Sequence, residues 1–166
     1  MKTILANGNN GLKVKSCTIY KTKNHYKIIT NSITDAGYLN TFPVFVLDIN
    51  CTNNELEIAI FKSLANSNSS RALKREEYAL NAKKVIEGIH EKSYTSLHRK
   101  STSCSITLHN KHRLVIRPYQ FYKSDSPRQG LKERQGEQVE IVSAYEHKAD
   151  VVNAILELFN KFPDHF

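Results

Sequence analysis

The sequence contains little of what marks the specialised protein classes: its 166 residues include three cysteines, six glycines, four prolines and no tryptophan. The low glycine and proline content excludes collagen-like and low-complexity chains, and 40% hydrophobic residues exclude a wholly disordered one. Cys17, Cys51 and Cys104 are odd in number and far apart, which argues against a disulfide framework and against a cysteine-based zinc site. We therefore expect a globular domain in which the cysteines are small buried side chains.

Long apolar runs are also missing. A secretory signal needs an apolar run of about 7–15 residues after a basic start, but Met1-Lys2-Thr3 is followed only by Ile4-Leu5-Ala6 before a polar stretch. No segment approaches the roughly 20 apolar residues of a membrane span. We expect a cytoplasmic protein without membrane contact, folded as a single domain of residues 1–166.

Residue periodicity predicts two β-hairpins, further strands and three helices. Runs of β-branched and aromatic residues predict hairpins at 13–32 and 104–117, with additional strands at 44–49 and 138–142. Amphipathic spacing predicts helices at 53–66, 71–90 and 148–162, the first beginning at a capping box of Thr52 and Glu55. The expected class is α+β, with antiparallel strands and with helices covering one face of the sheet.

The second half of the chain repeats the order of elements in the first half. A shift of 95 residues places Val44 on Val139 and Leu56 on Val151. We interpret this as two pseudo-repeats, about 13–66 and 104–162, which are duplicated antiparallel β-sheet-plus-helix units joined by the 71–90 helix. Chance similarity between two strand–helix pairs is the alternative.

The net charge of +8 is concentrated in two segments. Residues 1–34 contain six lysines and no acid, and residues 91–134 contain ten basic and three acidic residues. By contrast, residues 135–166 contain two basic and six acidic residues. This distribution predicts a basic sheet surface, whose partner is either a nucleic acid or an acidic protein.

Alternation along the strand expected at 113–121 would place basic and aromatic side chains on one face: Arg113, Val115, Arg117, Tyr119 and Phe121. Such a face could stack on single-stranded nucleic acid and neutralise its phosphates. An ordinary solvated sheet face has the same pattern. Because no RNA-recognition strand motif is present, the nucleic-acid signal is compositional only.

Catalytic motifs are absent: there is no Gly-rich phosphate loop, no Gly-x-Ser-x-Gly elbow and no His-Glu-x-x-His. His90, His98, His109 and His112 lie within 23 residues, and two histidines with a lysine could serve a metal-independent ribonuclease as acid and base. The candidate pair is His109 with His112. Both flank a predicted turn, however, where exposed polar residues are common. We expect a protein that is not an enzyme and that uses no cofactor or metal.

A series of short runs extends over about residues 13–162: Pro43-Val44-Phe45-Val46-Leu47, Glu55-Leu56, Ala59-Ile60, Ser63-Leu64, Ser67, Lys92-Ser93-Tyr94, Lys100, Ile106, Leu114, Ile116, Pro118, Glu137-Gln138-Val139 and Ala154-Ile155-Leu156. Together they resemble a family of contact-dependent growth inhibition (CDI) immunity proteins. The resemblance implies a cytoplasmic antitoxin that binds one cognate toxin, an EndoU-like RNase domain, and blocks its active site. It also implies a fold similar to the Whirly-type single-stranded-DNA-binding proteins, and it supplies no catalytic residues.

Inhibition by occlusion needs a complementary surface rather than chemistry, with a few Arg and Tyr anchors. We expect that surface on the second hairpin and the loop after it: Lys111, Arg113, Arg117, Tyr119, Tyr122, Lys123 and Arg128. The alternative function is a single-stranded nucleic-acid-binding module that uses the same basic face.

Overall fold

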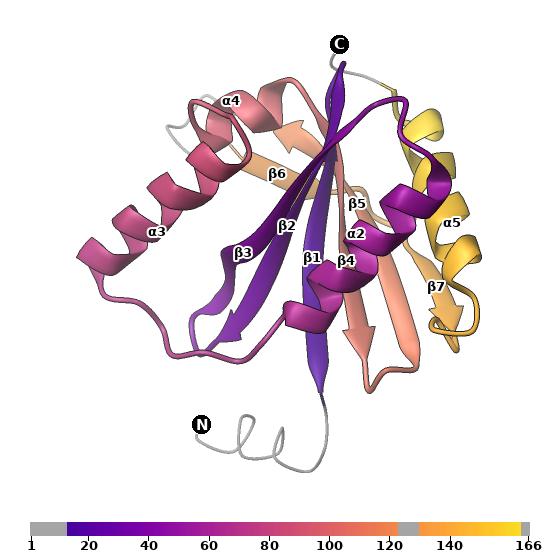
Figure 1. Cartoon of the computed structure of the whole chain (residues 1–166), viewed down its shortest axis with the longest axis horizontal. Helices are drawn as coiled ribbons and strands as arrows, with labels where there is room; N and C mark the ends of the chain where they lie inside the picture. Colours follow the sequence, from indigo (N-terminus) through magenta and orange to yellow (C-terminus); the bar gives the residue numbers. More distant parts are fainter. Residues whose placement is uncertain (1–12, 123–129, 164–166) are drawn as a thin grey trace.

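The computed structural model describes residues 13–122 and 130–163 (Figure 1). The first half contains β1 (Val14–Lys21), β2 (His25–Thr34), β3 (Gly37–Asp48), α2 (Asn53–Asn66) and α3 (Arg75–Gly88). The second half contains α4 (Tyr94–Arg99), β4 (Thr102–His109), β5 (Arg113–Tyr122), β6 (Gly130–Glu133), β7 (Val139–Val142) and α5 (Lys148–Lys161). The seven strands form one antiparallel sheet, so the predicted α+β class is confirmed.

The strand order is β3-β2-β1-β4-β5-β6, and β7 pairs with β5 beside β6. β6 lies along residues 119–122 of β5, whereas β7 lies along residues 113–116. The change of partner occurs at Pro118, whose carbonyl accepts the Arg134 N–H (2.9 Å). Proline has no backbone N–H. The gap between β6 and β7 therefore leaves no N–H of β5 without a partner at Pro118.

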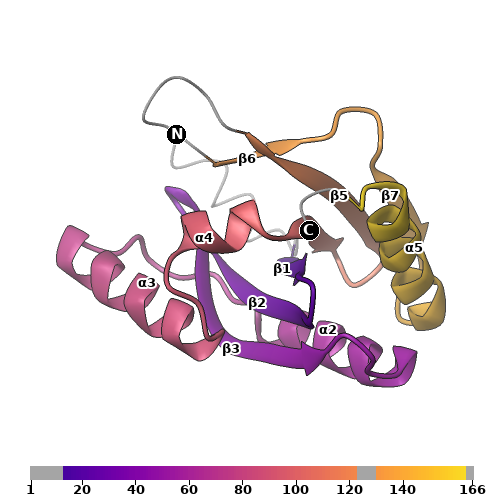
Figure 2. The same cartoon turned by 90° about the horizontal axis from the view of Figure 1, so that it is seen from above.

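Helices α2 and α5 cover one face of the sheet (Figures 1 and 2). The core beneath them joins both halves of the chain, with Ile19 of β1 and Ile106 of β4 buried against Ile60 of α2 and Ile155 of α5. Helix α2 has the predicted bounds and the predicted capping box, in which Thr52 Oγ1 accepts the Glu55 N–H (3.1 Å) and Glu55 accepts the Thr52 N–H (2.7 Å).

Helices α3 and α4 cover part of the opposite face, so the expectation that all helices lie on one side was wrong. The reason is that β3 is apolar on both faces. Phe45 faces the α2–α5 core, while Val44 and Val46 pack with Val85 of α3. Both sides of such a strand need a cover. Helix α3 is also shorter than the predicted 71–90.

Two short elements, α4 and β6, were not predicted, and β3 begins at Gly37 rather than at residue 44. β3 continues past Phe42 and Pro43 with a register shift, in which Ile29 pairs with Val44 and Thr30 with Thr41. A proline is tolerated there because β3 is an edge strand.

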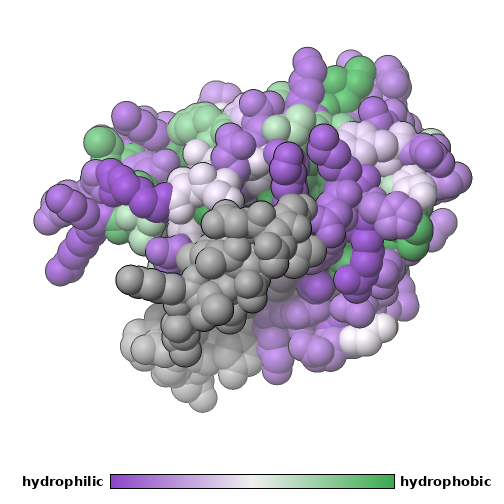
Figure 3. Space-filling model, turned by 90° about the horizontal axis from the view of Figure 1, so that it is seen from below, coloured by the Kyte–Doolittle hydropathy of each residue, from purple (hydrophilic) through white to green (hydrophobic). Residues whose placement is uncertain are grey.

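In each half of the chain, antiparallel strands precede a helix, α2 or α5, that packs on the same face. The Whirly-like duplication and the single-domain boundaries stay predictions. None of the helices in the described part of the chain is long and apolar enough to cross a membrane. Seen from below, the described surface is mostly hydrophilic with scattered apolar residues (Figure 3).

Candidate functional site

Three of the predicted site residues lie in one row along β5. Arg113, Arg117 and Tyr119 are an even number of residues apart, so their side chains emerge on the same face of the sheet, opposite the α2–α5 core. The Tyr119 hydroxyl oxygen is 3.4 Å from Ser105 Oγ of β4. We call Arg113, Arg117 and Tyr119, with the carboxylates that contact them, the β5 strip.

Lys111 lies in the β4–β5 turn and is exposed at the end of this strip. Asn110 and Lys111 both have positive φ angles, 54° and 59°, as tight hairpin turns require. The Asn110 side chain accepts the Lys13 backbone N–H (3.0 Å), which anchors the turn beside the start of β1.

The remaining predicted residues follow the strip. The Tyr122 backbone pairs with Gly130 of β6. The Tyr122 side chain, Lys123 and Arg128 lie outside the described residues. Their assignment to the site stays a prediction.

Both arginines of the strip are paired with glutamates, which the charge analysis did not anticipate. The Arg113 guanidinium contacts both carboxylate oxygens of Glu140 of β7, one of them at 3.3 Å. Arg117 Nε lies 3.7 Å from Glu133 of β6. Glu140 comes from the acidic segment 135–166 and Glu133 from the basic segment 91–134, so the strip presents both signs of charge rather than a purely basic surface.

Electrostatic effects along the strip follow from this pairing. The hydrogen bond from Arg113 lowers the pKa of Glu140. Partial burial, together with the charges of Arg113 and Arg117, lowers the pKa of His109. In the strip, the ionised form of Glu140 and the neutral form of the His109 imidazole are therefore both favoured.

His109 and His112 flank the β4–β5 turn, where the His112 N–H bonds to the His109 carbonyl (3.0 Å), but the histidines do not all converge there. The His98 ring stacks on Tyr20 with 5.8 Å between centroids, and Tyr20 pairs with Ser103 of β4. His109 is six residues further along the same strand, which corresponds to about 20 Å. Among the described residues, no three His, Cys, Asp or Glu side chains are grouped as a metal site.

Helix α4 borders the strip, and sequence reasoning missed it. The Arg99 guanidinium lies 6.0 Å from the Phe121 ring centroid, and Phe121 is on the same face of β5 as Tyr119. The available signal was Ser93, which caps the helix by accepting the Ser96 N–H (3.0 Å). Six residues are too few for helical periodicity to show.

A buried carboxylate between α3 and α4 was also missed. Glu91 contacts Lys27 of β2 at 2.5 Å and Lys100 at 2.7 Å. It is held there by the end of α3, where His90 has φ 57°, the His90 N–H bonds to Glu87 O and the Glu91 N–H bonds to Ile86 O. This is a Schellman motif, with histidine in the left-handed position that glycine usually occupies.

Comparison with known proteins identifies the family. The family model of the CDI immunity protein, CdiI, matches residues 15–161. No curated protein sequence matches the chain. A protein of unknown function from Neisseria meningitidis has a similar fold, with a TM-score of 0.65 and 19% sequence identity over 88% of this chain and 93% of that one. So does a chain of the CdiA-CT/CdiI toxin and immunity complex from Yersinia pseudotuberculosis, with a TM-score of 0.58 and 15% identity over 88% of this chain and 97% of that one.

Proposed function

Since the chain belongs to the CDI immunity protein family, we propose that it is an antitoxin that binds one cognate secreted bacterial toxin and blocks its active site. The observation that carries the proposal is the extent of the family match, residues 15–161. This range includes every described helix and every described strand, except for the first residue of β1. The fold similarity to a chain of a toxin and immunity complex agrees with it.

We propose further that the toxin is an EndoU-like RNase domain. This protein would then act in the cytoplasm, where the toxin meets its RNA substrate. The two halves of the chain would be duplicated Whirly-like units. These finer statements rest on the sequence resemblance and on the order of strands and helix in each half.

The proposed contact surface is the β5 strip extended by Lys111, Tyr122, Lys123 and Arg128. Arg and Tyr are the residue types that carry most binding energy in protein interfaces. Because Glu140 and Glu133 accompany Arg113 and Arg117, the toxin surface must offer cations as well as carboxylates. An interface of about 800 Å² on each partner is sufficient for occlusion.

Co-expression tests the proposal. The reading frame immediately upstream is expressed in a host bacterium with and without this protein, and growth is scored. The upstream product should stop growth alone and lose its toxicity when this protein is present. A harmless upstream product, or one that remains lethal in the presence of this protein, would contradict the proposal.

A single-stranded nucleic-acid-binding module is the second candidate, favoured by the row of Arg and Tyr on β5. Phosphate binding would weaken log-linearly with salt, with a slope of about 0.7 per neutralised phosphate of a single strand. The Arg–Glu pairs oppose it, because each carboxylate repels a phosphate. Failure to retain single-stranded oligonucleotides at low salt would remove this candidate.

A further inference from the structure

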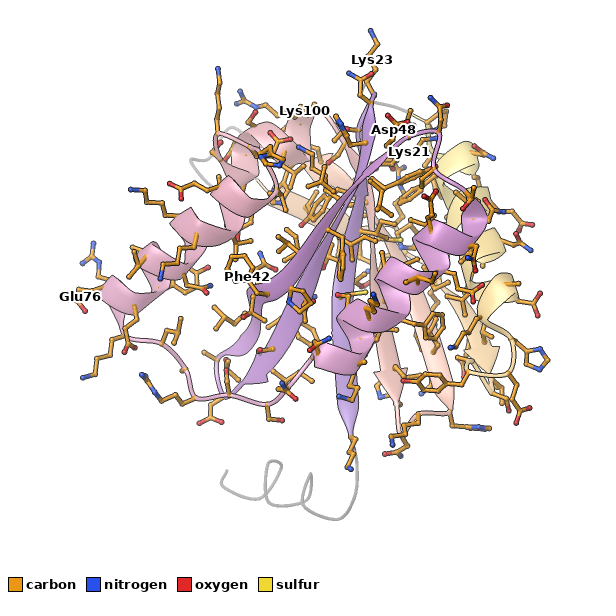
Figure 4. The ribbon with its side chains drawn as sticks, in the orientation of Figure 1. Lys21, Lys23, Phe42, Asp48, Glu76 and Lys100 are labelled. Atoms are coloured by element: carbon orange, nitrogen blue, oxygen red, sulfur yellow. The ribbon has the colours of Figure 1, made fainter. Side chains whose placement is uncertain are left out.

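Helix α3 has fully buried side chains only in its second half. Val85 and Ile86 are buried, whereas Tyr78, on the same helical stripe as Val85, is 57% exposed. Figure 1 shows α3 at the margin of the sheet, with its first turn furthest from β3. Figure 4 places Glu76 at that outer end. The first half of α3 therefore presents an exposed tyrosine, Tyr78, that the fold does not bury.

The neighbouring part of β3 also exposes aromatic side chains. Tyr38 is 58% exposed and Phe42 is 46% exposed. Asn40 lies between them on β3, and its carbonyl accepts a hydrogen bond from Asn81 Nδ2 of α3 (2.7 Å). Asn81 is less than one helical turn from Tyr78, so Tyr78 lies near this contact, whereas the Phe42 ring lies toward the Gly88 end of α3. We call Tyr38, Phe42 and Tyr78 the aromatic patch.

Close packing fixes the patch at its other end. A Cβ atom added to Gly88 would lie 3.0 Å from Val44 Cγ2 and 3.2 Å from a ring carbon of Phe42. Figure 4 shows Phe42 between α3 and β3. Since α3 lies flush against β3 at Gly88 and is bonded to it at Asn81, the patch is a preformed surface rather than a loose end.

The surroundings of the patch are basic. Lys74 and Arg75 precede Tyr78 by four and three residues and so share its side of α3, whereas Glu76 is on the opposite side. Neither the Lys74 ammonium nor the Arg75 guanidinium forms an ion pair with a carboxylate of residues 13–122 or 130–163. The neighbouring Glu77 pairs instead with Arg71 (2.8 Å). When the negative charge of Asp35 in the β2–β3 turn is set against the charges of Lys74 and Arg75, the net charge is still positive.

We propose that the aromatic patch is a second contact surface for the cognate toxin, which meets it with an apolar side chain flanked by carboxylates. This inference rests on the proposed function. α3 and α4 pack on the face of the sheet from which the β5 strip emerges, with α4 between α3 and β5 in Figure 2, so a partner that contacts both surfaces extends across α4. A second copy of the chain is disfavoured, because pairing two patches would bring Lys74 and Arg75 of each copy together.

Alanine variants test the inference. The probe is the domain encoded immediately upstream, purified and immobilised, and its binding to Tyr38→Ala and Tyr78→Ala variants is measured. Each variant should bind about tenfold more weakly or worse, as expected for aromatic interface anchors. Ile58→Ala and Tyr145→Ala are matched controls, because each also removes an exposed large side chain (46% and 39% exposed). Ile58 lies in α2 and Tyr145 lies just before α5, so both are away from the aromatic patch. The controls should bind like the wild type.

A charge-reversal variant distinguishes a loss of binding from a loss of folding. Arg75→Glu places an acid in the first turn of α3, where the helix dipole favours it, so folding should be unaffected. It should slow association with an acidic partner. If the wild type binds the probe while all three patch variants bind equally well, the inference is wrong and the proposed function stands. If the wild type does not bind, the proposed function fails and the inference with it.

The other occupants are distinguished in the same set of variants. Sedimentation of the free protein reports self-association, and a dimer that Tyr78→Ala dissociates would assign the patch to a second copy. Retention of a single-stranded oligonucleotide that Tyr78→Ala abolishes would assign it to nucleic acid. Either outcome would overturn the inference.

Discussion

The Glu91 carboxylate lies 2.5 Å from Lys27 Nζ, and the two side chains are 1% and 6% exposed. Lys100, which is half-exposed, contacts the other carboxylate oxygen at 2.7 Å. This arrangement ties the connection between α3 and α4 to β2, in the middle of the first three strands. Glu91 therefore anchors α4, which borders the β5 strip, and the end of α3, the helix that carries Tyr78 of the aromatic patch.

Replacing Glu91 with glutamine should destabilise the protein by about 3 kcal/mol or more, because Lys27 is left buried without a carboxylate. Urea unfolding followed by circular dichroism measures the change. A Lys27→Met/Glu91→Leu double variant should recover much of the loss, since it removes both charges. A Glu91→Gln variant as stable as the wild type would contradict the structural role.

The same carboxylate makes stability depend on pH. Burial by itself would raise the pKa of Glu91, but the hydrogen bonds and charges of Lys100 and Lys27 outweigh it and hold the pKa below the usual 4.5. A carboxyl group with a lowered folded-state pKa contributes stability above its unfolded-state pKa, and this contribution is lost as the pH falls through the folded-state value. Unfolding free energies measured from pH 7 down to below 4.5 should therefore decline more steeply for the wild type than for Glu91→Gln. Parallel pH profiles would contradict the assignment.

The exposed Arg113–Glu140 pair predicts a separation of binding from stability. Such pairs contribute about 0–1 kcal/mol to folding, so Arg113→Ala should unfold at nearly the wild-type urea concentration. Its affinity for the toxin should fall by about tenfold if Arg113 anchors the interface. Lys62→Ala, which removes an exposed cation from α2 on the opposite face, is the control. Equal affinity of Arg113→Ala and Lys62→Ala would exclude the β5 strip as the contact surface.

The capping box of α2 predicts a local stability effect. Thr52→Ala removes the oxygen that accepts the Glu55 N–H and should cost about 1 kcal/mol. For a chain of this size, that corresponds to a lowering of Tm by about 2–4 °C. Asn54→Ala in the same turn is the control and should change Tm little. A Thr52→Ala variant as stable as this control would show that the cap is not needed.

Elements with local signals could be predicted from the sequence. Helix α2 begins at a capping box and ends at the polar run from Asn66 to Ser70, so its bounds are written in adjacent residues. The two hairpins were likewise predicted from alternating residues around short turns. Elements as short as α4 and β6 have no readable periodicity, and they depend on long-range contacts such as Tyr20 with His98.

Ion pairs between residues far apart in the chain could not be predicted from the charge of each segment. Segment sums placed the positive surplus in residues 1–34 and 91–134, but the Arg113–Glu140 pair joins residues 27 apart and exists only because β7 lies beside β5. The Lys27–Glu91 pair joins residues 64 apart. Such pairs follow from sheet order and register, which the sequence pattern of a single strand does not contain.

Titrating the toxin with this protein measures whether one bound molecule blocks one active site. The domain encoded immediately upstream is incubated with RNA, and cleavage is followed as this protein is added. Cleavage should fall in proportion to the added protein and stop when the two are equimolar, because one bound molecule covers one active site. RNA cleavage that continues in the presence of excess protein would contradict it.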